Sequence, residues 1–230
     1  MRALKGSPKI CVSITEKDST KAAESIRRIE RYEPDLVELR IDYMQQPLDL
    51  ESVRNTTKLP IIATNRRLDQ GGILQRSDAE RLGTLMEACD AGFNYIDLEL
   101  NTPFAENFVD YVKGAGVKLI VSYHDFKETP SNDFLDEVKN MELDLGADIC
   151  KIAGTAVSPM DNITYLVFLA ENPGSKLVCF GMGRHGVMSR IFSPLFGGAF
   201  TYASTQSGME SAPGQLTIAD LRKLYRMLEI

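Results

Sequence analysis

The sequence predicts an α/β fold, a (β/α)8 TIM barrel that forms one domain over residues 1–230. Three observations support this prediction. Eight short apolar, strand-like runs begin at intervals of 23 to 35 residues, segments with helical character lie between them, and no change of composition divides the chain. Alternating strands and helices are typical of a parallel sheet, and eight consecutive units favour a closed barrel.

The individual elements follow from local pattern. The runs predicted as strands are residues 9–15, 36–42, 60–66, 95–100, 118–124, 149–154, 176–182 and 200–204. The predicted helices are 20–32, 78–91, 104–114, 131–145, 160–171 and 217–228, with weaker helical segments at 50–56 and 187–196. Ser77 and Glu80 form the pattern of a capping box at one helix start. An open doubly wound sheet is the alternative, and the lack of a Gly-x-Gly-x-x-Gly turn after the first strand weighs against it.

Lys151 stands in the middle of the apolar strand 149–154. Desolvating an ammonium group costs several kcal/mol unless it is paired or loses its proton. The same burial can lower the pKa of a lysine by several units and turn its amine into a nucleophile. The alternative interpretation is a lysine that reaches solvent or pairs with a carboxylate.

Polar and apolar residues alternate along several predicted strands. Residues that share one strand face are Glu38, Arg40 and Asp42; Thr64 and Arg66; Asp97 and Glu99; and Ser122 and His124. In a barrel the apolar faces meet the helices, so these polar faces point inward, toward the carboxyl ends where barrel enzymes hold their active sites. A structural network of ion pairs is the alternative.

Further candidates lie at strand ends and in the loops that follow. His124 ends the strand before that of Lys151, where it could carry protons, and Glu99 could orient its imidazole. Arg190 follows a glycine-rich loop and offers a planar group suited to a carboxylate. Ser211 and Gln215 lie in a small polar loop that would overhang the mouth of a barrel and could close over a substrate.

Bulk properties exclude several classes of protein. A net charge of −6 and a pI near 5.1 disfavour a nucleic-acid partner, and no apolar run has the 18 or more residues of a membrane span. The first eight residues lack the apolar segment of a signal peptide. The four cysteines contain no Cys-x-x-Cys pair, which predicts reduced thiols and a cytoplasmic protein. With only two histidines, a multi-histidine metal site is disfavoured.

Five motifs in order resemble those of one family, the type I 3-dehydroquinate dehydratases. They are Glu38-Leu39-Arg40-Ile41-Asp42, Ser122-Tyr123-His124-Asp125-Phe126, Lys151-Ile152-Ala153, Met182-Gly183-x-x-Gly186-x-x-Ser189-Arg190 and Ala212-Pro213-Gly214-Gln215. The resemblance covers residues 13–215 and implies a (β/α)8 barrel, a homodimer, and no metal or organic cofactor.

The resemblance also implies a role for each matched residue. Lys151 would form an imine with the ring ketone of the substrate, and His124 would move the protons, with Glu99 holding its imidazole. The remaining assignments are Arg190, Ser211 and Gln215 on the carboxylate side, Glu38, Arg40 and Arg66 on the ring hydroxyls and neighbouring groups, and Ser13, Asp42 and Asp97 in support. An aromatic residue is more usual in the family where Asn65 stands, so the choice of Arg66 over Arg67 depends on strand alternation.

The predicted function is the dehydration of 3-dehydroquinate to 3-dehydroshikimate in the shikimate pathway. Two alternatives stay open at this point. A Schiff-base aldolase on the same fold would use a similar lysine, but it usually binds a phosphate. A non-catalytic sensor of the same metabolite would need neither Lys151 nor His124.

Overall fold

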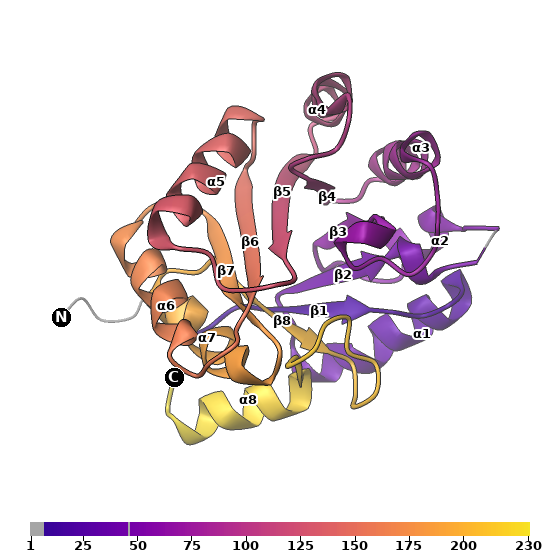
Figure 1. The fold of residues 1–230 in the computed structure, drawn as a ribbon. Helices are drawn as coiled ribbons and strands as arrows, with labels where there is room; N and C mark the ends of the chain where they lie inside the picture. The colour runs from indigo at the N-terminus through magenta and orange to yellow at the C-terminus, as the bar shows by residue number, and fades with distance from the viewer. Residues whose placement is uncertain (1–6, 46) are drawn as a thin grey trace.

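In the described part of the chain, eight parallel strands connected by helical segments, with a short ninth strand at one edge, curl into the barrel-like sheet of Figure 1. The computed structural model describes residues 7–45 and 47–230. The prediction that the first eight residues do not form a signal peptide concerns mostly residues 1–6, which lie outside the described residues. The strands are β1 (Ile10–Ile14), β2 (Leu36–Arg40), β3 (Ile61–Thr64), β4 (Tyr95–Glu99), β5 (Lys118–Asp125), β6 (Ile149–Thr155), β7 (Leu177–Met182), β8 (Thr201–Ser204) and the short β9 (Leu216–Thr217). The helices are α1 (Ser19–Ile29), α2 (Leu50–Arg54), α3 (Asp78–Asp90), α4 (Ala105–Gly114), α5 (Asn132–Asp144), α6 (Asp161–Glu171), α7 (Val187–Phe192) and α8 (Ile218–Met227).

The sheet has one weak junction, which we call the β7–β8 seam. Neighbours in the order β7-β6-β5-β4-β3-β2-β1-β8-β9 pair in parallel, and β7 and β8 stand apart in that order. At the seam the backbone N–H of Ala199 donates to the carbonyl of Leu177 at 2.7 Å. Higher up, the rings of Phe180 and Tyr202 meet edge to face with centroids 6.2 Å apart. Contacts between side chains therefore do much to hold β7 against β8 and close the barrel.

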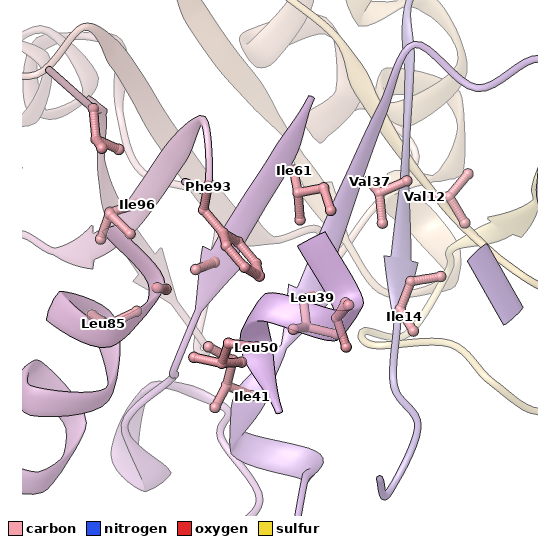
Figure 2. Close-up of a cluster of buried hydrophobic side chains, with 14 of the residues drawn as sticks. Val12, Ile14, Val37, Leu39, Ile41, Leu50, Ile61, Leu85, Phe93 and Ile96 are labelled. Atoms are coloured by element: carbon pink, nitrogen blue, oxygen red, sulfur yellow. The ribbon is translucent and has the colours of Figure 1, made fainter. Parts of the chain in front are cut away.

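The outward faces of the first strands form the largest part of the core (Figure 2). Val12 and Ile14 of β1 alternate with inward residues, as do Val37 and Leu39 of β2, and all four are fully buried. Leu85 of α3 belongs to the same cluster. Burying an aliphatic side chain of this size stabilises the fold by about 1.5–3 kcal/mol, so the alternation fixes which strand face meets the helices.

The inside of the barrel changes from apolar to polar along each strand. On β5 the inward series is Ile120, Ser122 and His124, and on the neighbouring β6 it begins with Ile149 and Lys151. Parallel pairing in register places Ser122 beside Lys151. The polar residues of several strands therefore gather at the carboxyl end of the barrel, where the sequence predicts the site.

The predicted barrel is confirmed, and the alternative of an open doubly wound sheet is wrong. All eight predicted strands are present, with ends shifted by a few residues, and the capping box of Ser77 and Glu80 forms at the start of α3. The predicted segment 187–196 divides into α7 and a 3-10 turn, because Pro194 cannot continue the α-helical hydrogen bonds. The pattern did not reveal β9, which is only two residues long.

Two findings bear on the environment of the chain. Across residues 7–45 and 47–230, no helix is long and apolar enough to cross a membrane. All four cysteines are free and buried.

Candidate active site

Lys151 lines a cavity at the carboxyl end of the barrel. Its side chain is 7% exposed, and its Nζ atom is 2.7 Å from Asp97 Oδ2 and 3.5 Å from Glu38 Oε1. The Nζ atom also lies 4.6 Å from the centroid of the Tyr202 ring. The amine is thus buried among two carboxylates and an aromatic face. It does not reach solvent, but it does pair with a carboxylate, Asp97, which was the other half of the alternative interpretation.

Asp97 of β4 connects Lys151 to a second buried cation. Its Oδ1 atom accepts hydrogen bonds from Arg66 Nη2 at 2.8 Å and from Ser122 Oγ at 2.7 Å. Burial alone would raise the pKa of this carboxyl group, but the charges of Arg66 and Lys151 and the hydrogen bonds hold it well below its ordinary value. Asp97 is therefore an anion that fixes both cations.

Glu38 of β2 is the second carboxylate near Lys151. Ser13 Oγ donates to Glu38 Oε2 at 2.7 Å, and Thr64 Oγ1 donates to Oε1 at 3.0 Å. Burial would raise the pKa of Glu38, but the nearby charges of Lys151 and Arg40 lower it below its ordinary value. Both oxygens are thereby oriented before any substrate binds.

His124, near the end of β5, lines the same cavity. Its ring stacks on Phe126 with centroids 6.0 Å apart and planes 17° apart, and its Nδ1 atom has no hydrogen-bond partner among the described residues. Burial, followed by the charges of Arg66 and Lys151, lowers its pKa well below the ordinary value. The imidazole is therefore neutral near pH 7 and able to accept a proton.

Glu99 does not hold the imidazole of His124 in this structure, which corrects the expectation from the sequence. Its Oε1 atom accepts from the backbone N–H of Arg67 at 2.9 Å, and its Oε2 atom accepts from Arg81 of α3. Arg81 is 1% exposed, and a buried guanidinium needs an anion. Arg81 of α3 thus binds the carboxylate of Glu99, which the strand pattern alone assigned to His124.

Arg190 of α7 reaches the cavity without an anionic partner. Its side chain is 2% exposed, and its Nε and Nη2 atoms have no hydrogen-bond partner within the described part of the chain. Burial lowers its pKa to about 10. The helix comes this close because Gly186 packs on the backbone of Gly181, where a Cβ atom would lie 2.3 Å from the carbonyl oxygen. A buried, unpaired guanidinium is suited to an anionic ligand.

Arg40 and the loop after β8 complete the rim. Arg40 donates to both oxygens of Asp42, at 2.9 and 2.8 Å, and to the carbonyl of Gly71 at 3.2 Å. The backbone N–H of Ser211 donates to Gln215 Oε1 at 2.8 Å, and Gln215 Nε2 lies 3.4 Å from Ser13 Oγ. The overhanging loop is therefore connected through Ser13 to Glu38.

The cavity brings together most of the residues singled out from the sequence. Its lining includes Lys151, His124, Glu38, Arg40, Arg66, Arg190, Ser211 and Gln215. Ser13 and Glu99 lie behind the lining, and Arg67 points away to pair with Asp69. Strand alternation could have found Phe180 and Tyr202, which also line the cavity, but no strand signal pointed to Arg81 of helix α3.

No group of three or more His, Cys, Asp or Glu side chains in residues 7–45 and 47–230 is arranged to hold a metal ion. The cations of the cavity are instead paired with buried carboxylates, mainly Asp42 and Asp97 behind the lining, whereas Arg190 has no such partner in the described part of the chain. The arrangement offers a buried amine, a neutral imidazole and an anion-binding group in one cavity.

Comparison with known proteins gives consistent results. The family model for type I 3-dehydroquinase matches residues 10–230. The 3-dehydroquinate dehydratase of Dehalococcoides mccartyi is 37% identical over 222 residues, covering 95% of each chain. That of Methanocaldococcus jannaschii is 34% identical over 225 residues, covering 96% of this chain and 99% of the relative.

Solved structures agree with these relatives. The 3-dehydroquinate dehydratase of Geobacillus kaustophilus superposes with a TM-score of 0.88 at 29% identity, covering 97% of this chain and 91% of that one. The type I enzyme of Clostridium difficile, solved with covalently modified comenic acid, has a TM-score of 0.86 at 26% identity, covering 98% and 94%. The chain therefore belongs to the type I 3-dehydroquinase family.

Proposed function

We propose that the chain dehydrates 3-dehydroquinate to 3-dehydroshikimate through an imine on Lys151, with His124 as the proton carrier. The observation that carries this proposal is that one cavity holds a buried amine, a neutral imidazole and the unpaired guanidinium of Arg190. A keto acid matches these three groups, because its carbonyl can meet the amine while its carboxylate meets the guanidinium.

The first half of the reaction makes an electron sink. Lys151 gives up a proton, its Nζ atom adds to the ketone carbon, and water leaves to give a cationic imine. Asp97 and Glu38, at 2.7 and 3.5 Å from Nζ, compensate the positive charge. The cationic imine then draws electrons from the neighbouring carbon–hydrogen bond, so loss of that proton gives a neutral enamine and no free carbanion.

The second half removes the hydroxyl group. His124 takes the proton from the carbon, becomes imidazolium, and returns that proton to the departing hydroxyl oxygen as the carbon–oxygen bond breaks. The enamine electrons form the new double bond, which leaves a conjugated imine. Water then hydrolyses this imine, releasing 3-dehydroshikimate and the free amine of Lys151.

The binding groups act around this centre. We assign Arg190, with Ser211 and Gln215 of the overhanging loop, to the substrate carboxylate. Glu38, Arg40 and Arg66 face the ring hydroxyls and neighbouring groups. Ser13 supports Glu38 through its 2.7 Å hydrogen bond. Glu99 supports the site indirectly, because it neutralises Arg81 and lies 3.5 Å from Arg66.

Trapping the imine tests the proposal. Borohydride added with 3-dehydroquinate should leave a substrate- or product-sized adduct on Lys151, located by peptide mass, while product absorbance appears in the untreated reaction. Lys151→Ala should abolish both signals with the fold retained, and Lys113→Ala, which changes a lysine paired with Asp148 outside the cavity, should keep both. Turnover by Lys151→Ala would refute the covalent route. An adduct without product in the unchanged chain would favour a sensor.

Two further properties belong to the same proposal. We propose a homodimer, supported by apolar side chains exposed on α6 and α7, namely Ile163, Val167 and Met188. Light scattering should give twice the chain mass of 25.6 kDa, and Ile163→Glu should halve that value.

The four free, buried thiols support a cytoplasmic location, which cell fractionation would test.

A further inference from the structure

Two aromatic rings lie beneath the two cations assigned to opposite ends of the substrate. Lys151 Nζ is 4.6 Å from the centroid of the Tyr202 ring, and Arg190 Cζ is 4.4 Å from that of Phe180. The two rings touch edge to face, with centroids 6.2 Å apart and planes 73° apart. The amine and the guanidinium are therefore connected through a continuous aromatic contact.

The position of this contact gives it mechanical importance. Phe180 belongs to β7 and Tyr202 to β8, so the contact crosses the β7–β8 seam, where the strand order shows no shared ladder. Both rings are nearly buried, at 3% and 4% exposed. Phe200 also packs edge-on against Tyr202, with centroids 5.4 Å apart. Ring packing, more than backbone hydrogen bonds, sets the spacing of the two strands at this level.

The ring of Tyr202, and not its hydroxyl group, makes the contact with Lys151. The hydroxyl oxygen is buried and has no hydrogen-bond partner among the described residues. A cation placed over an aromatic face is attracted by the ring quadrupole, most strongly where water is excluded. Each ring therefore holds its cation at a fixed position away from water, and this contact restricts the thermal motion of the cation.

We propose that Phe180 and Tyr202 form an aromatic platform that fixes the distance between Lys151 and Arg190 and so selects ketones whose carbonyl and carboxylate match that distance. This inference rests on the proposed function, which assigns the imine to Lys151 and the substrate carboxylate to Arg190. Phe180 and Tyr202 act as positioning residues. Misplacing a reacting group by about 1 Å can cost about 100-fold in rate, so a small shift of either cation has a measurable effect.

A selectivity ratio measures the platform. The rate of borohydride trapping on Lys151 is compared for 3-dehydroquinate and for 3,4-dihydroxycyclohexanone, a ring ketone that lacks the carboxylate. Phe180→Leu should slow trapping of the keto acid by about 10-fold or more, because Arg190 loses the aromatic ring beneath it. The simple ketone should be little affected, because it has no carboxylate for Arg190 to bind. Tyr202→Leu should slow both ketones, because the amine itself is displaced.

Matched variants separate positioning from general damage to the core. Phe200→Leu makes a cavity in the same aromatic cluster but keeps the rings of Phe180 and Tyr202 beneath the two cations. It should therefore keep the selectivity ratio. Tyr202→Phe retains the ring face and should keep the trapping rates that Tyr202→Leu lowers for both ketones. If the rings act as one unit, the Phe180→Leu/Tyr202→Leu double variant should lose less than the product of the two single losses.

The outcomes distinguish this inference from the proposed function. An unchanged chain that neither forms an adduct nor makes product would overturn both. An active, trappable chain whose Phe180→Leu variant keeps the full ratio would overturn the platform alone. Strictly multiplicative losses in the double variant, or an equal loss of ratio in Phe200→Leu, would also overturn it.

Discussion

Asp97 Oδ2 lies 2.7 Å from Lys151 Nζ, and the other oxygen of the same carboxylate accepts from Arg66 at 2.8 Å. One anion therefore compensates two cations that are both almost fully buried. The three groups come from β3, β4 and β6 or their ends, so this network links strands across the barrel mouth. Its stability depends on Asp97 remaining ionised.

Acid should weaken the fold through Asp97. Its folded-state pKa is depressed, so its contribution is complete above the unfolded-state pKa of about 4 and is lost as pH falls toward the folded-state value. Asp97→Asn should cost about 3–5 kcal/mol in the free energy of unfolding at pH 7, because it leaves two buried cations poorly compensated. Its acid-dependent loss should also be smaller. Urea unfolding at pH 7 and pH 3 measures both effects.

Asp69→Asn is the matched control for that experiment. Asp69 pairs with Arg67 at 3.0 Å, but its side chain is 59% exposed. An exposed pair contributes about 0–1 kcal/mol, so this variant should unfold nearly as the unchanged chain does at both pH values. If Asp97→Asn showed the same acid dependence as the unchanged chain, Asp97 would not be the group that titrates.

His124→Ala should separate imine formation from dehydration. The amine of Lys151 is untouched, so borohydride should still trap a substrate adduct. Without the proton carrier, product formation should fall by about 10²- to 10⁴-fold. Single-turnover absorbance and intact mass, measured on the same samples, report the two steps. Near-normal product formation would remove His124 from the proton-transfer role.

The fall of kcat/KM on the acid side of the pH profile should occur at a lower pH than an ordinary histidine would give. Burial and the charges of Arg66 and Lys151 lower the pKa of His124 well below its ordinary value of about 6.5. The neutral base therefore persists as pH falls from 8 through about 6.5, and kcat/KM should not decline there because of His124. Initial rates at constant ionic strength measure this profile. A half-maximal point near pH 6.5 that disappears in His124→Ala would contradict the assignment.

Strand alternation explains why so much of the site was predictable. A two-residue period assigned Glu38, Arg66 and Asp97 to the inside of the barrel, and parallel pairing then brought them together with Lys151, which stood out as a lysine in an apolar strand. The same rule separates Arg66, which faces Asp97, from Arg67, which turns outward to Asp69. These features depend on local geometry, which the sequence specifies directly.

Partner choice inside the barrel was less predictable, because it depends on elements far away in the sequence. Arg81 of α3 takes the carboxylate of Glu99, and nothing in the strand pattern reveals a helical arginine that points inward. The β7–β8 seam was also hidden, because each strand reads as an ordinary apolar run. Which ring lies beneath which cation depends on the packing of Phe180 and Tyr202 across that seam.

Glu99→Gln should damage stability more than proton transfer. The change leaves the guanidinium of Arg81, which is 1% exposed, with the half-exposed Asp78 as its remaining anion, so the loss should be at most about 3–5 kcal/mol, the cost of breaking a buried pair. Replacing both partners, in Glu99→Leu/Arg81→Leu, should recover part of that loss, as a double-mutant cycle in urea can show. A dehydration defect as large as that of His124→Ala, with stability unchanged, would instead restore Glu99 to the imidazole.

Glu142 is a buried acid that the proposed reaction does not use. It lies on α5, is fully buried, and neither carboxylate oxygen has a hydrogen-bond partner among the described residues. Burial raises its pKa well above the ordinary value, although the Cys150 thiol and the backbone and charge of Lys151 act in the opposite direction. The folded chain therefore holds Glu142 as a neutral acid, although an unfolded chain ionises it above a pH of about 4.3.

Replacing this acid by its amide should stabilise the protein increasingly as pH rises. Where only the unfolded chain ionises Glu142, each pH unit costs about 1.4 kcal/mol of unfolding free energy, and Glu142→Gln escapes that cost because an amide does not titrate. The two proteins should converge below about pH 4, where both states hold the proton. Urea unfolding from pH 4.5 to 8 measures the difference. Glu137→Gln, on the exposed side of the same helix, should run parallel to the unchanged chain. Parallel curves for Glu142→Gln as well would mean that the carboxyl group is ionised, and therefore compensated, in the folded protein.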